Sequence, residues 1–116
     1  MLTFHMLKRA NKERMQVWSP GRGWTGADWS NQMGGEAGEA MNVVKKLRIA
    51  ETGTQRFEMP TDDELKQKLA DELADTVICA DLLAQYYGID LGSAVCKKFN
   101  EVSRRENLPV FLNAVA

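Results

Sequence analysis

The strongest constraint on the fold of this chain comes from two pairs of acidic residues that interrupt otherwise apolar helical faces. Glu36 and Glu39 form one pair, and Glu72 and Asp75 form the other. Residues three positions apart lie on one face of a helix. The apolar residues around the two pairs are Met33, Ala37, Ala40, Met41, Val43, Val44, Leu69, Leu73, Val77 and Ile78. Burying four carboxylates there is costly because they repel one another and lose hydration, and a divalent cation is the simplest compensation.

The spacing along the chain predicts that the two pairs lie level with each other. We expect one helix from about residue 27 to 49, a short polar link, and a second helix that begins after the capping box at 61–64. Helices joined by a short link are usually antiparallel neighbours. Glu39 lies about ten residues before the end of the first helix and Glu72 about ten after the start of the second, ~15 Å along each axis.

Two further helices complete the prediction of an all-α fold. Residues 2–17 carry apolar side chains at helical intervals, and Thr3 is a candidate N-cap. Gly88 is expected to end the third helix, and Asp90 to cap a fourth helix over 91–105. We therefore expect a four-helix bundle forming a single domain over residues 1–116, with a short apolar C-terminal tail.

Composition excludes several classes of function. The chain has 116 residues, 44% of them hydrophobic and 27% charged, and a formal net charge of -1. These values are ordinary for a globular protein, and the near-neutral charge provides no basic field to attract nucleic acid. No apolar run approaches the ~18 to 20 residues of a membrane span, and the N-terminus lacks the apolar core of a signal peptide. We expect a cytoplasmic protein without nucleic-acid or membrane partners.

The available ligands favour magnesium. His5 is the only histidine, and Cys79 and Cys96 form no Cys-x-x-Cys motif, so both cysteines are expected to be reduced structural thiols. A site built only from carboxylate oxygens suits Mg²⁺ or Mn²⁺ rather than zinc. Mg²⁺ often bridges carboxylates to substrate phosphates, so we expect a phosphorylated substrate and a metal-activated water as nucleophile. The chain contains no P-loop motif.

Three motifs occur in an order and spacing that resemble a known family. They are Gly-Glu-Ala-Gly-Glu-Ala at 35–40, Glu-Leu-Ala-Asp at 72–75 and Lys-Phe-Asn-Glu-Val-Ser-Arg-Arg at 98–105. Together they resemble the MazG-like, all-α nucleoside triphosphate pyrophosphohydrolases. The resemblance implies a four-helix core, a dimer or dimer of dimers, and Mg²⁺-dependent cleavage between the α and β phosphates, which releases a nucleoside monophosphate and pyrophosphate.

The resemblance also implies the roles of the acidic residues. Glu36, Glu39, Glu72 and Asp75 would be the metal ligands and the catalytic residues. Gly35 is a departure, because many members of the family carry a further Glu at that position. One accessory carboxylate is therefore missing from this chain.

The fourth predicted helix offers candidate substrate-binding residues. Lys98 and Arg104 could neutralise a triphosphate, and Asn100 could hydrogen-bond a base or a sugar. The alternative is a solvated basic face with ion pairs such as Glu101 with Arg105.

Three residues elsewhere are further candidates for substrate binding. Lys46 lies on roughly the same helical face as Glu39 and could contact phosphate, although it could equally be an ordinary exposed lysine. Trp18 and Trp29 could stack on a nucleobase, although core or interface packing is the commoner role of tryptophan.

The sequence leaves three functional hypotheses. The first is a pyrophosphohydrolase that removes a (d)NTP from the nucleotide pool as a homodimer or homotetramer. The second is a catalytically silent helical module that binds a nucleotide or a protein partner, which the glycine at position 35 favours. The third is phosphoribosyl-ATP pyrophosphohydrolase chemistry, which related helical enzymes perform.

Overall fold

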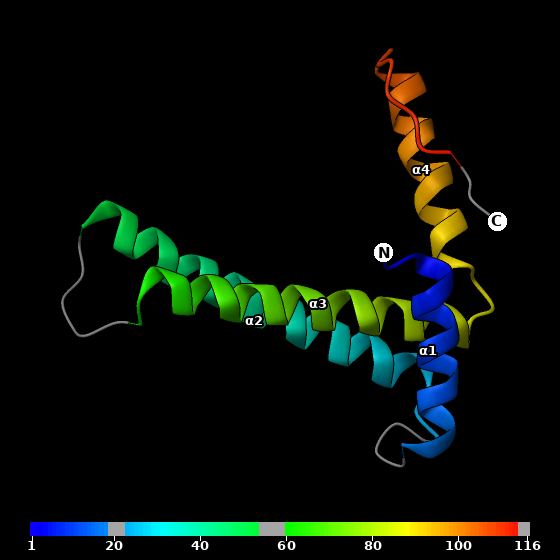
Figure 1. The fold of residues 1–116 in the computed structure, drawn as a ribbon, viewed down its shortest axis with the longest axis horizontal. Helices are drawn as coiled ribbons and strands as arrows, with labels where there is room; N and C mark the ends of the chain where they lie inside the picture. Colours follow the sequence, from blue (N-terminus) through cyan, green and yellow to red (C-terminus); the bar gives the residue numbers. More distant parts are fainter. Residues whose placement is uncertain (19–22, 54–59, 114–116) are drawn as a thin grey trace. The chain divides into compact units, whose positions relative to one another are not determined.

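Helices make up all the regular structure that the computed structural model describes, which covers residues 1–18, 23–53 and 60–113. Four helices and no strand occur in these ranges: α1 (Phe4–Val17), α2 (Gly26–Thr52), α3 (Asp62–Tyr86) and α4 (Leu91–Arg105) (Figure 1). The all-α prediction is therefore confirmed for this part of the chain. None of the described helices combines the length and the apolar character that crossing a membrane requires.

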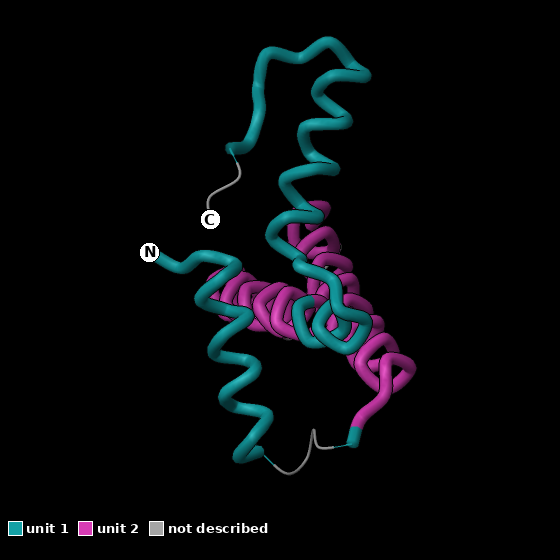
Figure 2. Tube along the Cα trace, turned by 90° about the vertical axis from the view of Figure 1, so that its right-hand side faces the viewer, with its two compact units in different colours: residues 1–23, 81–116 teal, residues 24–80 magenta. Residues whose placement is uncertain are grey.

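The chain divides into two compact units, coloured separately in Figure 2. Unit 1 comprises residues 1–23 and 81–116, and unit 2 comprises residues 24–80. Unit 1 contains α1, α4 and the end of α3, whereas unit 2 contains α2 and the rest of α3. The single domain over residues 1–116 stays a prediction.

The helix ends lie close to where the sequence predicts them, because capping side chains fix them. Thr3 accepts a hydrogen bond from the backbone N–H of Met6, and Asp90 accepts one from that of Ser93. Reciprocal capping boxes join Thr25 to Asp28 and Thr61 to Glu64. Gly88 has a φ of 68°, and the hydrogen bond from Ile89 N–H to the Ala84 carbonyl gives α3 a Schellman ending.

Unit 2 is an antiparallel pair of helices whose contact seam contains two acidic residues (Figures 1 and 2). Less exposed positions recur at alternating spacings of four and three, the pattern of two helices packed side by side. The repeating set on α2 is Trp29, Met33, Glu36, Ala40, Val43 and Leu47, and on α3 it is Leu65, Leu69, Glu72, Thr76 and Cys79. Val43 lies in the seam and is 2% exposed, whereas its neighbour Val44 lies outside the seam and is 49% exposed.

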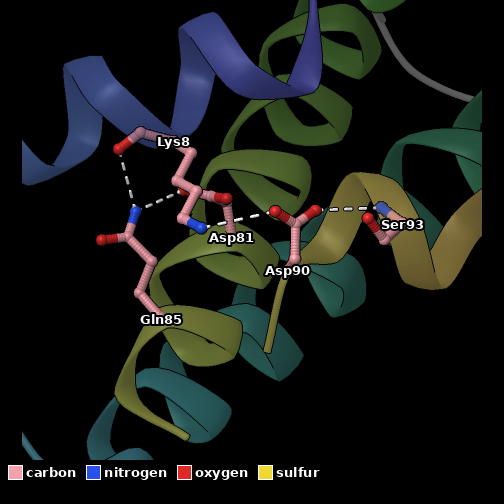
Figure 3. A network of polar contacts seen from close by, with 5 residues as sticks. All are labelled: Lys8, Asp81, Gln85, Asp90 and Ser93. Carbon is pink, nitrogen blue, oxygen red and sulfur yellow. Dashed lines mark hydrogen bonds and ion pairs between the residues drawn. The ribbon is translucent and has the colours of Figure 1, made fainter. Parts of the chain in front are cut away.

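A polar network joins the three helices of unit 1 (Figure 3). The buried carboxylate of Asp81 on α3 accepts hydrogen bonds from Asn11 of α1 at 2.9 Å and from Gln85 at 2.8 Å. Gln85 also donates to the backbone carbonyl of Lys8, whose ammonium group lies 3.4 Å from Asp90 at the start of α4. These contacts fix α1 against the end of α3 and the start of α4.

The chain after α4 folds back along that helix. Asn107 has a φ of 55°, and Leu108 N–H donates to the Ser103 carbonyl at 2.7 Å, which closes a Schellman motif with asparagine in the usual place of glycine. Pro109 follows and prevents the helix from continuing. Residues 108–113, called the return segment below, therefore belong to unit 1 and run beside α4 (Figure 1).

Candidate metal centre

Three of the four predicted ligands converge in unit 2. Glu36 and Glu39 of α2 and Glu72 of α3 each offer one carboxylate oxygen, and these oxygens all lie within 4.8 Å of one another. We call these three residues the acidic cluster. Glu36 and Glu72 are partly buried because they occupy positions of the helix seam, whereas Glu39 is exposed at its edge. Carboxylate oxygens are the ligands that Mg²⁺ and Mn²⁺ prefer.

Glu72 is the residue of the cluster that most needs neutralising. Its Oε2 atom is buried, and no hydrogen-bond partner for it occurs among the described residues. When Glu72 is protonated it can share its proton in a hydrogen bond with Glu36 and, to a smaller extent, with Glu39, and this effect, followed by burial, raises the pKa of Glu72 to about 7. Glu72 therefore carries a proton in acid and is mostly ionised above pH 7, where the three carboxylates repel one another more strongly.

Gln32 contacts one carboxylate of the acidic cluster and was not predicted as a site residue. Its side-chain amide donates to Glu36 Oε1 at 2.9 Å from one helical turn earlier. Such contacts restrict the orientation of a carboxylate, as residues around metal ligands commonly do. The spacing i, i+4 on a helix was the signal in the sequence that could have revealed this pair.

Asp75 lies outside the group of three oxygens within 4.8 Å of one another. The reason is the opposite direction of the two helices. Glu36 and Glu72 lie level with each other across the seam. The step of three residues from Glu36 to Glu39 and the step from Glu72 to Asp75 run in opposite directions along the antiparallel helices. The backbones of Glu39 and Asp75 are therefore separated by roughly 9 Å along the seam. The carboxylates of Glu36 and Asp75 both act on Cys79, whose thiol pKa is raised mainly by burial and then by these two charges. The ligand role of Asp75 stays a prediction.

Gly35 has room for the carboxylate that the family resemblance would place there. It is exposed, and a Cβ atom at this position would meet no other group within 4 Å. Steric exclusion in the chain itself therefore does not explain the glycine.

The predicted basic residues of α4 are exposed, and some are already paired. Lys98 forms an ion pair with Glu101 at 3.3 Å, and Arg105 pairs with Glu106 at 3.1 Å. Arg104 is exposed in the last turn of α4, and Lys46 is exposed on α2. Exposed pairs of this kind contribute little and break readily, so the phosphate-binding roles of Lys46, Lys98 and Arg104 stay predictions.

Asn100 is engaged by the chain's own return segment. Its Nδ2 donates to the Leu112 carbonyl at 2.8 Å, and its Oδ1 accepts from the Leu112 N–H, also at 2.8 Å. The thiol of Cys96, one turn earlier, lies 3.3 Å from the same carbonyl. A base or sugar that used the Asn100 amide would have to displace Leu112.

The tryptophans differ in what they could offer to a nucleobase. Trp29 is only 7% exposed, and its ring centroid lies 4.5 Å from that of Trp24, so it packs mainly against protein. Trp18 is 44% exposed, with the Arg14 guanidinium 5.6 Å from its ring centroid. Base stacking by Trp18 and Trp29 stays a prediction, and only Trp18 presents a substantial open surface.

An open hollow of about 560 Å³ lies along α4, and none of its lining residues is acidic. Its lining is mostly apolar and includes Val95, Phe99, Val102 and Leu108, with Lys98 as its charged residue.

Comparison with protein families found no match for the chain, and comparisons with curated proteins and with solved structures found none either.

Proposed function

We propose that this protein is a Mg²⁺-dependent hydrolase that cleaves a nucleoside triphosphate to a nucleoside monophosphate and pyrophosphate. One observation carries the proposal. Three carboxylates converge across a helix seam, and one of their oxygens is buried without a hydrogen-bond partner among the described residues. Buried acidic groups of one sign persist only where a proton or a cation compensates them. The motif order along the sequence supports the choice of substrate.

The roles of the acidic residues follow from their positions. Glu36, Glu39 and Glu72 would hold the cation, with Gln32 keeping Glu36 in orientation. The cation would supply charge neutralisation for the triphosphate and a lowered pKa for the attacking water. Asp75, on the same helix as Glu72, would contribute a further carboxylate or orient the water. Lys46, Lys98 and Arg104 are proposed to contact phosphates, and Asn100, Trp18 and Trp29 to contact the nucleoside.

Pyrophosphate release from a panel of NTPs and dNTPs with Mg²⁺, including phosphoribosyl-ATP, tests the proposal. Glu39→Gln and Glu72→Gln should abolish turnover while the helical circular dichroism signal survives. Asp71→Asn is the matched control, because Asp71 is exposed, hydrogen-bonds Gln67 and lies outside the acidic cluster. Wild-type turnover in either cluster variant would contradict the metal assignment. Asp75→Asn then decides whether the fourth carboxylate is required.

The second candidate is a catalytically silent module that binds a nucleotide or a protein partner. Two observations favour it: only three of the four predicted ligands have oxygens within 4.8 Å of one another, and the further Glu is replaced by Gly35. Absence of turnover for every triphosphate in the panel, together with measurable nucleotide binding, would favour this module over the enzyme.

We also propose that the protein works as a homodimer or homotetramer. Large apolar side chains outside the seam of unit 2 are exposed, among them Met41 at 73% and Leu73 at 52%. Such residues are often covered by another subunit when several lie close together. Sedimentation equilibrium tests this proposal, and a monomer at all accessible concentrations would contradict it.

A further inference from the structure

The contact between Asn100 and Leu112 occupies both hydrogen-bonding groups of a side chain that the sequence proposes for nucleoside binding. An asparagine amide offers two N–H donors and one carbonyl acceptor. Here Nδ2 and Oδ1 bind the carbonyl and the N–H of a single residue in the return segment. The same Nδ2 also lies 3.7 Å from the Cys96 sulfur. Both hydrogen-bonding groups of the Asn100 amide are thus already engaged by the chain itself.

The return segment is held mainly by backbone contacts rather than by buried side chains. Val110 is 59% exposed, Phe111 is 47% exposed and Leu112 is 41% exposed. Segments that bury little apolar surface open at low cost compared with global unfolding. The Schellman motif at Asn107 and the following Pro109 fix the direction in which the segment leaves α4, so it can return to the same place after each release.

We propose that the return segment is a built-in competitor of nucleotide binding at α4. While Leu112 is bound, Asn100 is unavailable, and the segment must leave before this residue can contact a base or a sugar. The inference rests on the proposed function, because it takes Asn100 to be a nucleoside ligand. The segment would set the concentration of nucleotide at which the protein responds.

The size of the effect follows from how often the segment is bound. Apparent affinity falls in proportion to the fraction of protein that is competent to bind. A segment bound for about nine-tenths of the time would therefore raise KM roughly tenfold. Shortening the chain to end at Val110 removes Leu112 but keeps the Schellman motif and Leu108. This variant should show a KM lower by about that factor and an unchanged kcat.

Two point variants of Leu112 distinguish loss of the contact with Asn100 from general effects of truncation. Leu112→Pro removes the N–H that Asn100 accepts, whereas Leu112→Ala keeps both backbone groups. The proposal expects Leu112→Pro to lower KM and Leu112→Ala to match the wild type. If the shortened chain does not fold, this pair still decides the question. Equal KM values in the wild type, Leu112→Pro and Leu112→Ala would overturn the proposal that the return segment competes with nucleotide.

Hydrogen exchange of the Leu112 amide gives a second readout that does not depend on turnover. A non-hydrolysable nucleoside triphosphate analogue with Mg²⁺ should accelerate this exchange in the wild type, because the nucleotide displaces the segment. Unchanged protection of the Leu112 amide at a saturating concentration of analogue would overturn the proposed competition even if hydrolysis is confirmed.

Failure of the proposed function gives a different pattern. If the wild type turns over no triphosphate, calorimetric titration of the analogue into the full chain and the shortened chain still tests the competitor. Tighter binding by the shortened chain would support it. Equal binding, or no binding by either chain, would overturn it.

Discussion

Glu36 of α2 and Glu72 of α3 face each other across the seam of an antiparallel helix pair, with carboxylate oxygens within 4.8 Å. Both residues stand at positions that the seam pattern reserves for apolar side chains, between Met33 and Ala40 on one helix and between Leu69 and Thr76 on the other. Each helix therefore has a carboxylate instead of an apolar side chain at the same level of the seam. The proposed cation would compensate both charges at this level.

Glu72 gives the metal-free protein a specific pH dependence. Its pKa in the folded chain is about 7, above the ordinary value of 4.5. Between these values the folded state binds more protons than the unfolded state, so this group's contribution to stability is present in acid and is lost as pH rises towards 7. Urea unfolding in EDTA should show this loss in the wild type and not in Glu72→Gln. Identical pH profiles for the two proteins would contradict the assigned pKa.

Substitutions at Gly35 test whether the acidic cluster repels further charge. Gly35→Gln should stabilise the metal-free protein by up to about 1 kcal/mol, because glycine is a poor helix former and the site has open space around it. Gly35→Glu should stabilise less, since its charge adds to those of Glu36 and Glu39. The difference between the two variants should shrink when Mn²⁺ is added. Thermal unfolding with and without Mn²⁺ measures it, and an equal effect of Mn²⁺ on both would argue against a cation near position 35.

The buried network of unit 1 should be a large contributor to stability. Asn11→Ala leaves the buried Asp81 carboxylate with one hydrogen bond fewer. Loss of a partner for a buried polar group costs about 1–3 kcal/mol. Denaturant unfolding should show a shift of this size, whereas Lys12→Ala, at the neighbouring exposed position, should change stability little. A shift below about 0.5 kcal/mol for Asn11→Ala would mean that the network is dispensable.

The sequence predicted the helices well because capping chemistry is local. Thr61 and Glu64, like Asp90 and Gly88, fix helix ends through residues a few positions away, and all of these are visible in the sequence. The closeness of the two acidic pairs was also predictable, because it needs only the helix rise and an antiparallel connection, but the register differs: the seam places Glu36, rather than Glu39, level with Glu72. Glu36, Glu39 and Glu72 do lie close together, whereas Asp75, the fourth predicted ligand, lies outside their group.

Other features depend on which residue of a pair faces a neighbour, and such choices are made by tertiary packing. The selection of Val43 over Val44, and the separation of Asp75 from the acidic cluster, follow from the seam's spacing of three and four. The contact of Asn100 with Leu112 joins residues twelve positions apart through a reversal of the chain. Local patterns do not encode such a contact, although Pro109 marks where the helix must stop.

Calorimetric titration of Mn²⁺ into the wild type and into Glu72→Gln, at a pH above 7 where Glu72 is mostly ionised, tests the central claim most directly. The account predicts saturable binding by the wild type and a loss of at least tenfold in affinity for Glu72→Gln, with Asp71→Asn unchanged and all three proteins equally helical. Equal Mn²⁺ affinity in the wild type and Glu72→Gln, or no binding by the wild type, would contradict a cation held by Glu36, Glu39 and Glu72.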